Sequence, residues 1–132
     1  MLQISKNVYN ELLQHALKDA PIEACGYLAE KDGVITLHYP LTNKESSAEH
    51  FSFDPKEQFD TVRKIRAEKM KLAAVYHSHP QTPARPSQED IRLAFDPDVS
   101  YVIVSLADGK TSVRSFRISR GSVEEEAITI VE

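Results

Sequence analysis

The first twenty residues carry the periodicity of an amphipathic helix. Apolar side chains recur there every three or four positions with polar residues between them, so a helix over residues 4–20 would have one apolar face. Pro21 lacks the amide donor of a helix interior and restricts the residue before it, so the helix is expected to end there. The apolar positions are Ile4, Val8, Leu12, Leu13, Ala16, Leu17 and Ala20.

After Pro21 the pattern changes to short strands that alternate with two further helices. Asp54-Pro55 offers an N-cap followed by proline at the first helical position, and Asp96-Pro97 ends the third helix. The predicted strands cover residues 23–29, 34–39, 72–76, 99–106, 111–118 and 127–131, and the predicted helices cover residues 4–20, 55–71 and 87–95. The almost wholly apolar strand 99–106 is expected at the centre of the sheet, and the tail is expected to form a meander. This order predicts an α/β fold.

Residues 40–55 interrupt the alternation with a polar, irregular segment. Phe51 and Phe53 alternate within it as they would on a strand, so we expect a surface loop that ends in an edge strand over residues 51–53. The alternative is that both rings only cover the core. An edge strand has unpaired backbone groups and could therefore pair with an extended peptide.

Size and composition are those of one ordinary domain. A chain of 132 residues, 41% hydrophobic and 27% charged, can bury a core of its own, so we expect one domain over residues 1–132. The net charge of -4 gives no electrostatic reason for a nucleic-acid partner. One cysteine, Cys25, excludes an internal disulfide. Without a leader or an apolar run of about 20 residues, no membrane is implied and a cytoplasmic location is expected.

A segment with two histidines carries the candidate chemistry. His77 and His79 directly follow the predicted strand 72–76. If its alternation continues through them, both imidazoles would project from one face, with Ser78 on the other. Asp90 follows Ser87 by three residues, in the first turn of a helix that Ser87 would cap. Two imidazoles and one carboxylate suit a zinc ion that keeps a fourth position open for water.

Hydrolysis also needs a base. Zinc lowers the pKa of a bound water to about 7, and a group outside the ligand set must still take the proton. In metalloproteases this group is a glutamate. Glu23 is the candidate, because it lies where the first helix gives way to a strand, and functional groups gather at strand ends. Sequence alone does not bring Glu23 near His77.

Each of these residues also has an ordinary explanation. A His-x-His pair on a strand is more often incidental than metal-binding. Ser87 would cap its helix in any case, Asp90 would be a first-turn acid favoured by the helix dipole, and Glu23 would be a solvated carboxylate. Structural roles are also expected for Cys25, as a buried hydrophobe rather than a ligand or redox switch, and for His15, His38 and His50, on the polar side of a helix, on a strand and in a loop.

Taken together, the residues resemble the JAMM (MPN+) metalloprotease motif. His77-Ser78-His79-Pro80 is followed after seven residues by Ser87 and after two more by Asp90, and Glu23 lies upstream in Pro21-Ile22-Glu23-Ala24-Cys25-Gly26. Every position of the motif is filled, and the order of helices and strands fits from residue 5 to residue 106. The resemblance implies a mixed, curved β-sheet flanked by helices, similar to the sheet of cytidine deaminases.

Carried onto these positions, the resemblance implies a zinc metallopeptidase. His77, His79 and Asp90 would bind one zinc ion, with a water in the fourth place. Glu23 would act as general acid and base, and Ser87 would help to hold the oxyanion of the tetrahedral intermediate. Ser78 would make a structural hydrogen bond at most.

The resemblance also implies a class of substrate. Members of the family cleave peptide or isopeptide bonds after the C-terminal Gly-Gly of ubiquitin-like proteins. With only short loops at residues 40–49 and 81–86, the chain is similar to small prokaryotic members that act on sulfur-carrier proteins. A ubiquitin-like or sulfur-carrier protein is therefore the expected partner, and its slim Gly-Gly tail could pair with the edge strand at residues 51–53.

Three other functions stay open at this point. A zinc deaminase would need His-x-Glu and a later Pro-Cys-x-x-Cys, and the single cysteine argues against it. A non-catalytic scaffold related to the family usually lacks one or more motif residues, whereas all of them are present here. A zinc hydrolase that acts on another amide, or in a DNA-linked task, has the least support from the net charge.

Overall fold

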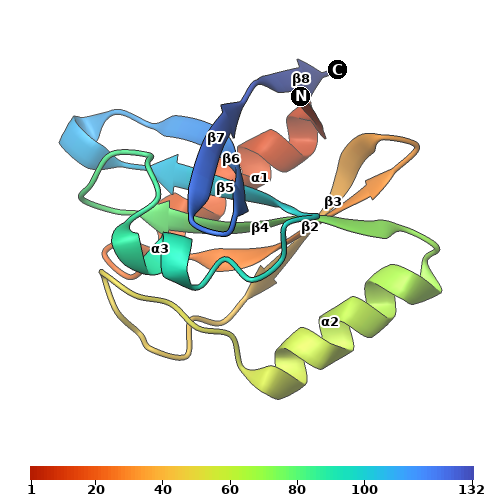
Figure 1. The fold of residues 1–132 in the computed structure, drawn as a ribbon, viewed down its shortest axis with the longest axis horizontal. Coiled ribbons are helices and arrows are strands. Elements are labelled where there is room, and N and C mark those ends of the chain that lie inside the picture. The colour runs from red at the N-terminus through yellow and green to blue at the C-terminus, as the bar shows by residue number, and fades with distance from the viewer.

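The computed structural model describes residues 1–132 and places eight strands in one curved sheet (Figure 1). The strands are β1 (Leu2–Ser5), β2 (Cys25–Lys31), β3 (Val34–Leu41), β4 (Lys71–His79), β5 (Ser100–Ser105), β6 (Ser112–Ser119), β7 (Ser122–Glu126) and β8 (Ile128–Val131). The helices are α1 (Lys6–Asp19), α2 (Pro55–Ala67) and α3 (Gln88–Arg92), with a 3-10 turn at Ala107–Gly109.

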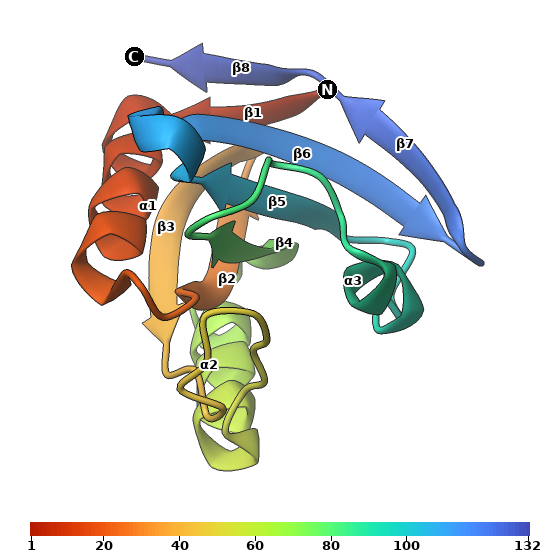
Figure 2. The ribbon, with the colours of Figure 1, turned by 90° about the vertical axis from the view of Figure 1, so that its left-hand side faces the viewer.

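The sheet curls so far that its two outermost strands are consecutive in the chain. The strand order is β7-β6-β5-β4-β2-β3-β1-β8, and only Ala127 separates β7 from β8. Figure 2 shows the resulting arc. β4 pairs in parallel with β5, as β1 does with β3 and β8, whereas all other pairs are antiparallel. The predicted mixed, curved α/β sheet is confirmed.

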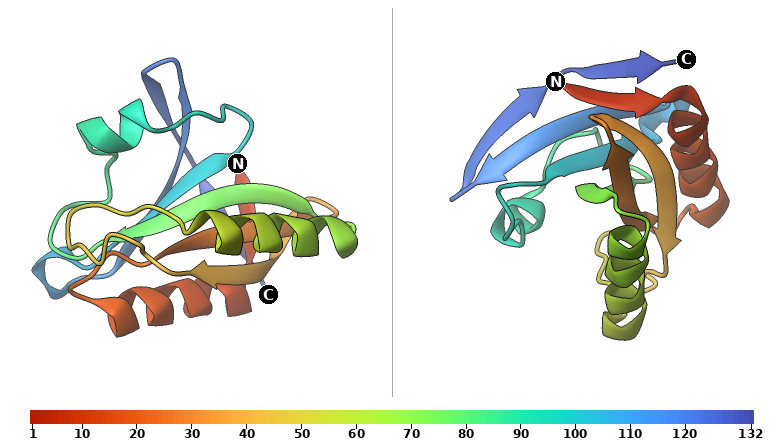
Figure 3. Two further views of the ribbon diagram at one scale, coloured as in Figure 1. Left: turned by 90° about the horizontal axis from the view of Figure 1, so that it is seen from below. Right: turned by 90° about the vertical axis from the view of Figure 1, so that its right-hand side faces the viewer.

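Figure 3 shows α1 and α2 well apart from each other. Each of these two longer helices contributes to a separate core. Because side chains alternate along β4, Tyr76 joins the cluster that contains the apolar face of α1, and Val75 packs against the cluster that contains Ile65 of α2. A third cluster, which includes Ala84 and Ile103, lies near α3 and packs against Ile91. The middle of the sheet is therefore covered on both faces, and β4 runs through it.

The prediction of a helix from residue 4 was wrong at its start. Leu2 and Ile4 are buried and alternate with half-buried neighbours, which is the period of a strand, and β1 pairs with both β3 and β8. Ser5 ends the strand and caps α1, because its side chain accepts a hydrogen bond from the Val8 amide at 3.2 Å. Ile4 thus fits the helical spacing by coincidence.

The predicted edge strand at residues 51–53 was also wrong. This segment forms a single isolated bridge between Asn43 and Phe53 and joins no strand of the sheet. Phe53 packs on the ring of Tyr27, with centroids 5.0 Å apart, and Phe51 stacks on His77. The alternation of the two rings therefore reflects packing on the sheet rather than pairing with it. Phe53 covers the core, as the alternative interpretation held for both rings, whereas Phe51 covers His77.

Several element ends differ from the predictions. β5 is the third strand of the sheet and not its centre, which β4 and β2 occupy. The meander stops at β7, and β8 leaves it to pair with β1. The second helix ends at Ala67 because Lys69 takes a positive φ before β4 begins, and the third ends at Arg92 rather than at residue 95.

No helix in the structure has both the length and the apolar character needed to cross a membrane.

Candidate metal centre and catalytic site

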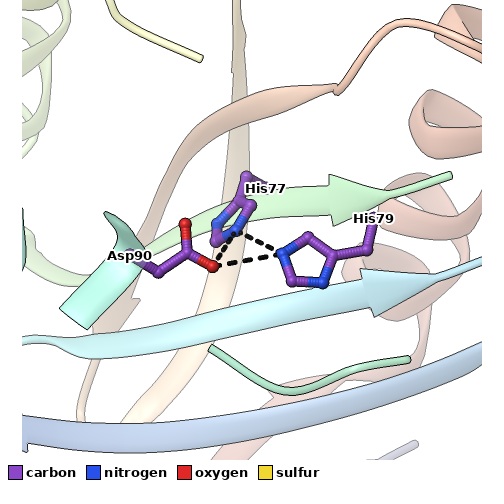
Figure 4. A group of neighbouring side chains, drawn as sticks. All are labelled: His77, His79 and Asp90. Carbon is purple, nitrogen blue, oxygen red and sulfur yellow. Dashed lines mark hydrogen bonds and ion pairs between the residues drawn. The ribbon is translucent and has the colours of Figure 1, made fainter. Parts of the chain in front are cut away.

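β4 delivers two imidazoles to one place at its C-terminal end. His77 and His79 project from the same face of the strand, and Asp90 reaches them from α3 (Figure 4). The Nε2 atoms of the two histidines lie 3.1 Å apart, and Oδ2 of Asp90 lies 3.2 Å from Nε2 of His77 and 3.1 Å from Nε2 of His79. Three atoms that could hold a metal ion, two from β4 and one from α3, therefore meet.

The donor set and its spacing fit a zinc ion. Zinc takes nitrogen and carboxylate ligands at roughly 2.0–2.2 Å in a tetrahedron, so neighbouring ligand atoms lie roughly 3.3–3.5 Å apart. The observed separations of 3.1–3.2 Å need only a small expansion to reach that value. Two imidazoles and one carboxylate would leave one of the four positions for a water molecule or a substrate.

Neighbouring groups orient both histidine rings. Nδ1 of His79 lies 2.9 Å from the carbonyl oxygen of Pro83, and donation of a proton to that oxygen leaves Nε2 free to bind a metal. The ring of His77 stacks on Phe51, with centroids 4.6 Å apart and planes 23° from parallel. Both imidazoles are buried, so the site has little freedom to rearrange.

Asp90 is held by the start of its own helix. Ser87 caps α3 by accepting a hydrogen bond from the Asp90 amide at 3.0 Å, and Asp90 accepts one from the Ser87 amide at 2.9 Å. Burial disfavours the charged form of Asp90, but the contacts with the His77 and His79 rings and the hydrogen bond from the Ser87 amide outweigh it and hold the carboxyl pKa well below its usual range. Asp90 is therefore an anion.

Glu23 lies in the connection between α1 and β2 and is buried. Its amide donates to the carbonyl oxygen of Ser47 at 2.9 Å, and its own carbonyl accepts from the Asn43 side chain at 3.1 Å. Burial raises the pKa of the Glu23 carboxyl to about 7, and the charge of Asp90 adds to this while that of His79 opposes it. With a pKa near 7, the Glu23 carboxyl can gain or lose a proton near neutral pH.

Ser78 ties the Glu23 segment to the strand that carries the histidines. The Ser78 side chain accepts a hydrogen bond from the Ala24 amide at 2.8 Å, and the Ser78 amide donates to the Ala24 carbonyl at 2.9 Å. Because Ser78 lies between His77 and His79, this pair of bonds fixes Glu23 relative to both. Ser78 makes a structural hydrogen bond, which is the role expected of it.

Sequence reasoning missed Asn43, which organises the loop beside the site. The side chain of Asn43 is buried and bonds backbone groups on both of its polar atoms. Its Nδ2 donates to the carbonyls of Glu23, Ser47 and His50, and its Oδ1 accepts from the amides of Glu45 and Ser52. One asparagine in a polar loop has no periodicity to mark it, and asparagine's tendency to bond nearby backbone was the only available signal.

Cys25 lies beside the site without joining it. It is paired with His77 in the register of β2 and β4, is fully buried, and its Sγ lies 3.8 Å from the carbonyl oxygen of Leu41. Burial raises the pKa of this thiol to about 12, so it is neutral. The expected role of a small buried hydrophobe agrees with this environment.

The three remaining histidines, His15, His38 and His50, lie in different environments. His50 is exposed in its loop and lies 2.8 Å from Glu89, which connects the loop to α3. His15 and His38 are not incidental: both lie on the α1 side of the sheet and hydrogen-bond the hydroxyl of Tyr76. His38 lies on β3, as expected, but the assignment of His15 to the polar side of its helix was wrong, because the His15 ring bonds the hydroxyl of the buried Tyr76.

Comparisons with curated proteins give relatives along the whole chain. A CysO-cysteine peptidase from Mycobacterium tuberculosis is 38% identical over 135 residues, which cover 100% of this chain and 92% of that protein. A probable TtuB-protein conjugate cleaving protease from Thermus thermophilus is 32% identical, covering 99% of this chain and 84% of the relative. A desampylase from Haloferax volcanii is 28% identical over 87% of both chains.

Solved structures agree with the fold. A protein from Desulfitobacterium hafniense, known from a solution structure, is 44% identical, with a TM-score of 0.90 over 100% of this chain and 94% of its own. A JAB1/MPN domain protein from Archaeoglobus fulgidus, 22% identical over 100% of this chain and 98% of its own, reaches a TM-score of 0.66. The family of prokaryotic homologues of the JAB domain matches residues 5–119, and this chain belongs to that family.

Proposed function

We propose that this protein is a zinc-dependent peptidase that hydrolyses the bond after the C-terminal Gly-Gly of a ubiquitin-like or sulfur-carrier protein. The observation that carries the proposal is the meeting of His77, His79 and Asp90, with three ligand atoms within 4.8 Å of one another. Relatives named as a CysO-cysteine peptidase and a conjugate cleaving protease support the reaction class.

The metal would be held by Nε2 of His77, Nε2 of His79 and Oδ2 of Asp90. When bound, zinc would polarise water and the scissile carbonyl, which makes neutral-pH hydrolysis feasible. Pro83 would keep His79 in the tautomer that ligates through Nε2, and Phe51 would keep the His77 ring in its plane. These contacts would preorganise the ligands before substrate arrives.

Glu23 would move the proton in the reaction. As a carboxylate it would accept a proton from the attacking water, and as a carboxylic acid it would return that proton to the leaving amine. A carboxyl pKa of about 7 supports both roles, because neither protonation state is strongly disfavoured at neutral pH. Backbone bonds through Ser47, Asn43 and Ala24 would hold Glu23 in position for this transfer.

Ser87 would donate to the oxyanion that forms on the scissile carbonyl. Its oxygen accepts from the Asp90 amide in the cap, and a hydroxyl can accept and donate at the same time. The proton is therefore available for a developing negative charge, and the position at the start of α3 keeps the hydroxyl next to the Asp90 ligand. Capping and oxyanion binding are compatible in one residue.

The experiment is cleavage of a defined carrier. A small ubiquitin-like protein that ends in Gly-Gly followed by one further residue is incubated with the purified, zinc-loaded protein, and the carrier mass is followed by mass spectrometry. The expected product is the carrier ending in Gly-Gly. Chelation of the metal should stop the reaction, and restored zinc should restart it. An intact carrier at high enzyme concentration, with zinc bound, would contradict the proposal.

A further inference from the structure

A small basic pocket lies beside the loop that follows β4. Its volume is about 350 Å³, and it is lined on one side by loop residues 83–85 and on the other by residues of β5, β6 and their connection. The charged side chains of its lining are Arg85, Lys110 and Arg114, with no acidic residue among them. Three cationic side chains therefore surround this cavity, although the whole chain has a net charge of -4. The volume of the cavity is near the lower limit of the range usual for small-molecule binding sites.

The positive charge of this pocket is only partly compensated within the protein. Nη1 of Arg114 lies 3.6 Å from Oε1 of Glu125, and both side chains are about half exposed. Arg85 and Lys110 have no acidic partner within ion-pair distance. Ser112 adds a hydroxyl to the lining. The pocket thus presents cationic donors and a hydroxyl, a chemistry that suits a small carboxylate.

The pocket shares its wall with the candidate metal centre. Pro83 lines the pocket, and its carbonyl oxygen lies 2.9 Å from Nδ1 of His79. Ser105, also in the lining, is paired with His79 in the register of β4 and β5, so both side chains are on the same face of the sheet. Arg85 is two residues before Ser87 in the chain. The pocket is therefore a neighbour of the metal ligands.

We infer that this pocket binds the α-carboxylate of the group released by hydrolysis. The inference rests on the proposed function and specifies its substrate: a carrier whose Gly-Gly is followed by a short extension with a free C-terminus. Arg85 and Lys110 would contact the carboxylate, and Arg114 would add to the positive electrostatic potential of the pocket. These residues would determine specificity, and none of them would take part in the bond-breaking step.

The chemistry of the leaving group explains why such a pocket would discriminate. Hydrolysis breaks the bond between the glycine carbonyl carbon and the next nitrogen. The water oxygen stays on the carrier as a new carboxylate, and a proton goes to the leaving amine. When the leaving group is one amino acid, its α-carboxylate is close to the scissile bond and stays negative throughout. An isopeptide-linked lysine side chain has no such charge at that distance.

The test compares two carriers that differ in one group. Both end in Gly-Gly-Ala, one with a free carboxylate and the other with a C-terminal carboxamide. For the unmodified protein, kcat/KM should be roughly 10- to 100-fold higher for the carboxylate form, the usual effect of a charge-assisted hydrogen bond. In Arg85→Gln and in Lys110→Gln this preference should fall several-fold. The matched control is Lys31→Gln, an exposed cation at the far end of β2, which should keep the full preference.

A binding measurement separates this inference from the proposed function. Calorimetry with the Glu23→Gln protein and both carriers should give tighter binding of the carboxylate form, and the difference should shrink when Arg85→Gln is added. Equal cleavage and equal binding of the two forms would overturn the pocket assignment and leave the peptidase proposal standing. Tighter binding of the carboxylate form without cleavage of either carrier by the unmodified protein would overturn the peptidase proposal instead.

Discussion

β4 carries a histidine cluster on each of its two faces, and the two clusters differ in what lies at their centre. On the α1 side, the hydroxyl of Tyr76 hydrogen-bonds both His15 and His38, at 2.6 Å in the case of His15. The outer ring nitrogens lie 3.0 Å from Asp19 and 3.5 Å from Glu11. Every ring nitrogen of this His15–Tyr76–His38 cluster therefore has a protein partner.

On the opposite face, no protein group fills the centre. The Nε2 atoms of His77 and His79 have only each other and the Asp90 carboxylate as neighbours at hydrogen-bond distance. Both clusters contain two histidines and at least one acid, so composition does not distinguish them. What differs is that a tyrosine hydroxyl satisfies the first, whereas the second has three lone-pair donors facing one point, the arrangement that a metal ion requires.

The largest expected effect is on metal content. We expect His77→Ala to reduce bound zinc from one ion per chain to none after dialysis, because two ligands no longer define a tight site. His38→Ala, which breaks the other cluster, should keep one ion per chain. Elemental analysis of both proteins is the measurement. Zinc that survives in His77→Ala but is lost in His38→Ala would reverse the roles given to the two faces.

The next effect separates binding of the metal from catalysis. Glu23→Gln removes the proposed proton acceptor and keeps the size of the side chain, so kcat should fall roughly 10²- to 10⁴-fold. Zinc content should stay at one ion per chain, because Glu23 is not among the ligand atoms. Cleavage of the carrier is followed together with elemental analysis. Turnover equal to that of the unmodified protein would remove Glu23 from the mechanism.

Much of the fold follows from patterns that are local in the chain. The amphipathic spacing of the first helix, the Asp54-Pro55 start of α2 and the alternation that puts His77 and His79 on one face each depend on a few neighbouring residues. The strand at residues 127–131 was predicted, but β1 and the pairing of β1 with β8 could not be found in this way. Each is only four residues long, and they form a sheet edge by pairing residues from opposite ends of the chain, such as Ile4 with Ile130.

The same distinction between local and long-range contacts applies to the candidate site. The spacing of His77, His79, Ser87 and Asp90 lies within one strand, one loop and one helical turn, so sequence reasoning could group them. The contributions of Asn43 and Phe51 depend on a loop folding back on β2 and β4, and no periodicity records that contact. For the same reason, Tyr76 as the shared partner of His15 and His38 was not foreseeable from positions 61 and 38 residues away.

A smaller effect is expected at Ser87, and it has two components. Ser87→Ala should lower kcat roughly 10²-fold through loss of the proposed oxyanion donor. It should also destabilise the protein by about 1 kcal/mol, because α3 loses its N-cap. Ser87→Thr keeps the hydroxyl and should restore most of both properties. Steady-state kinetics and urea unfolding measure the two components separately. A Thr variant as slow as the Ala variant would argue against the oxyanion role.

The smallest expected effect is on the free energy of unfolding, and it comes from the His15–Tyr76–His38 cluster on the α1 side. Burial lowers the pKa of His38 to about 4, so between pH 6.5 and pH 4 the unfolded chain binds a proton that the folded protein excludes. Stability should therefore fall as the pH drops through this window, and His38 should contribute about 1–2 kcal/mol of the loss between pH 7 and pH 5.

The comparison of the unmodified protein with His38→Phe isolates this contribution, because the metal-site histidines are present in both proteins and cancel in the difference. Urea unfolding at pH 7 and pH 5 should show the smaller pH dependence in His38→Phe. Equal pH dependence in the two proteins would mean that His38 accepts a proton without leaving its bond to Tyr76. The His15–Tyr76–His38 cluster would then tolerate a positive charge. It would differ from the proposed metal-binding group only in the arrangement of its atoms.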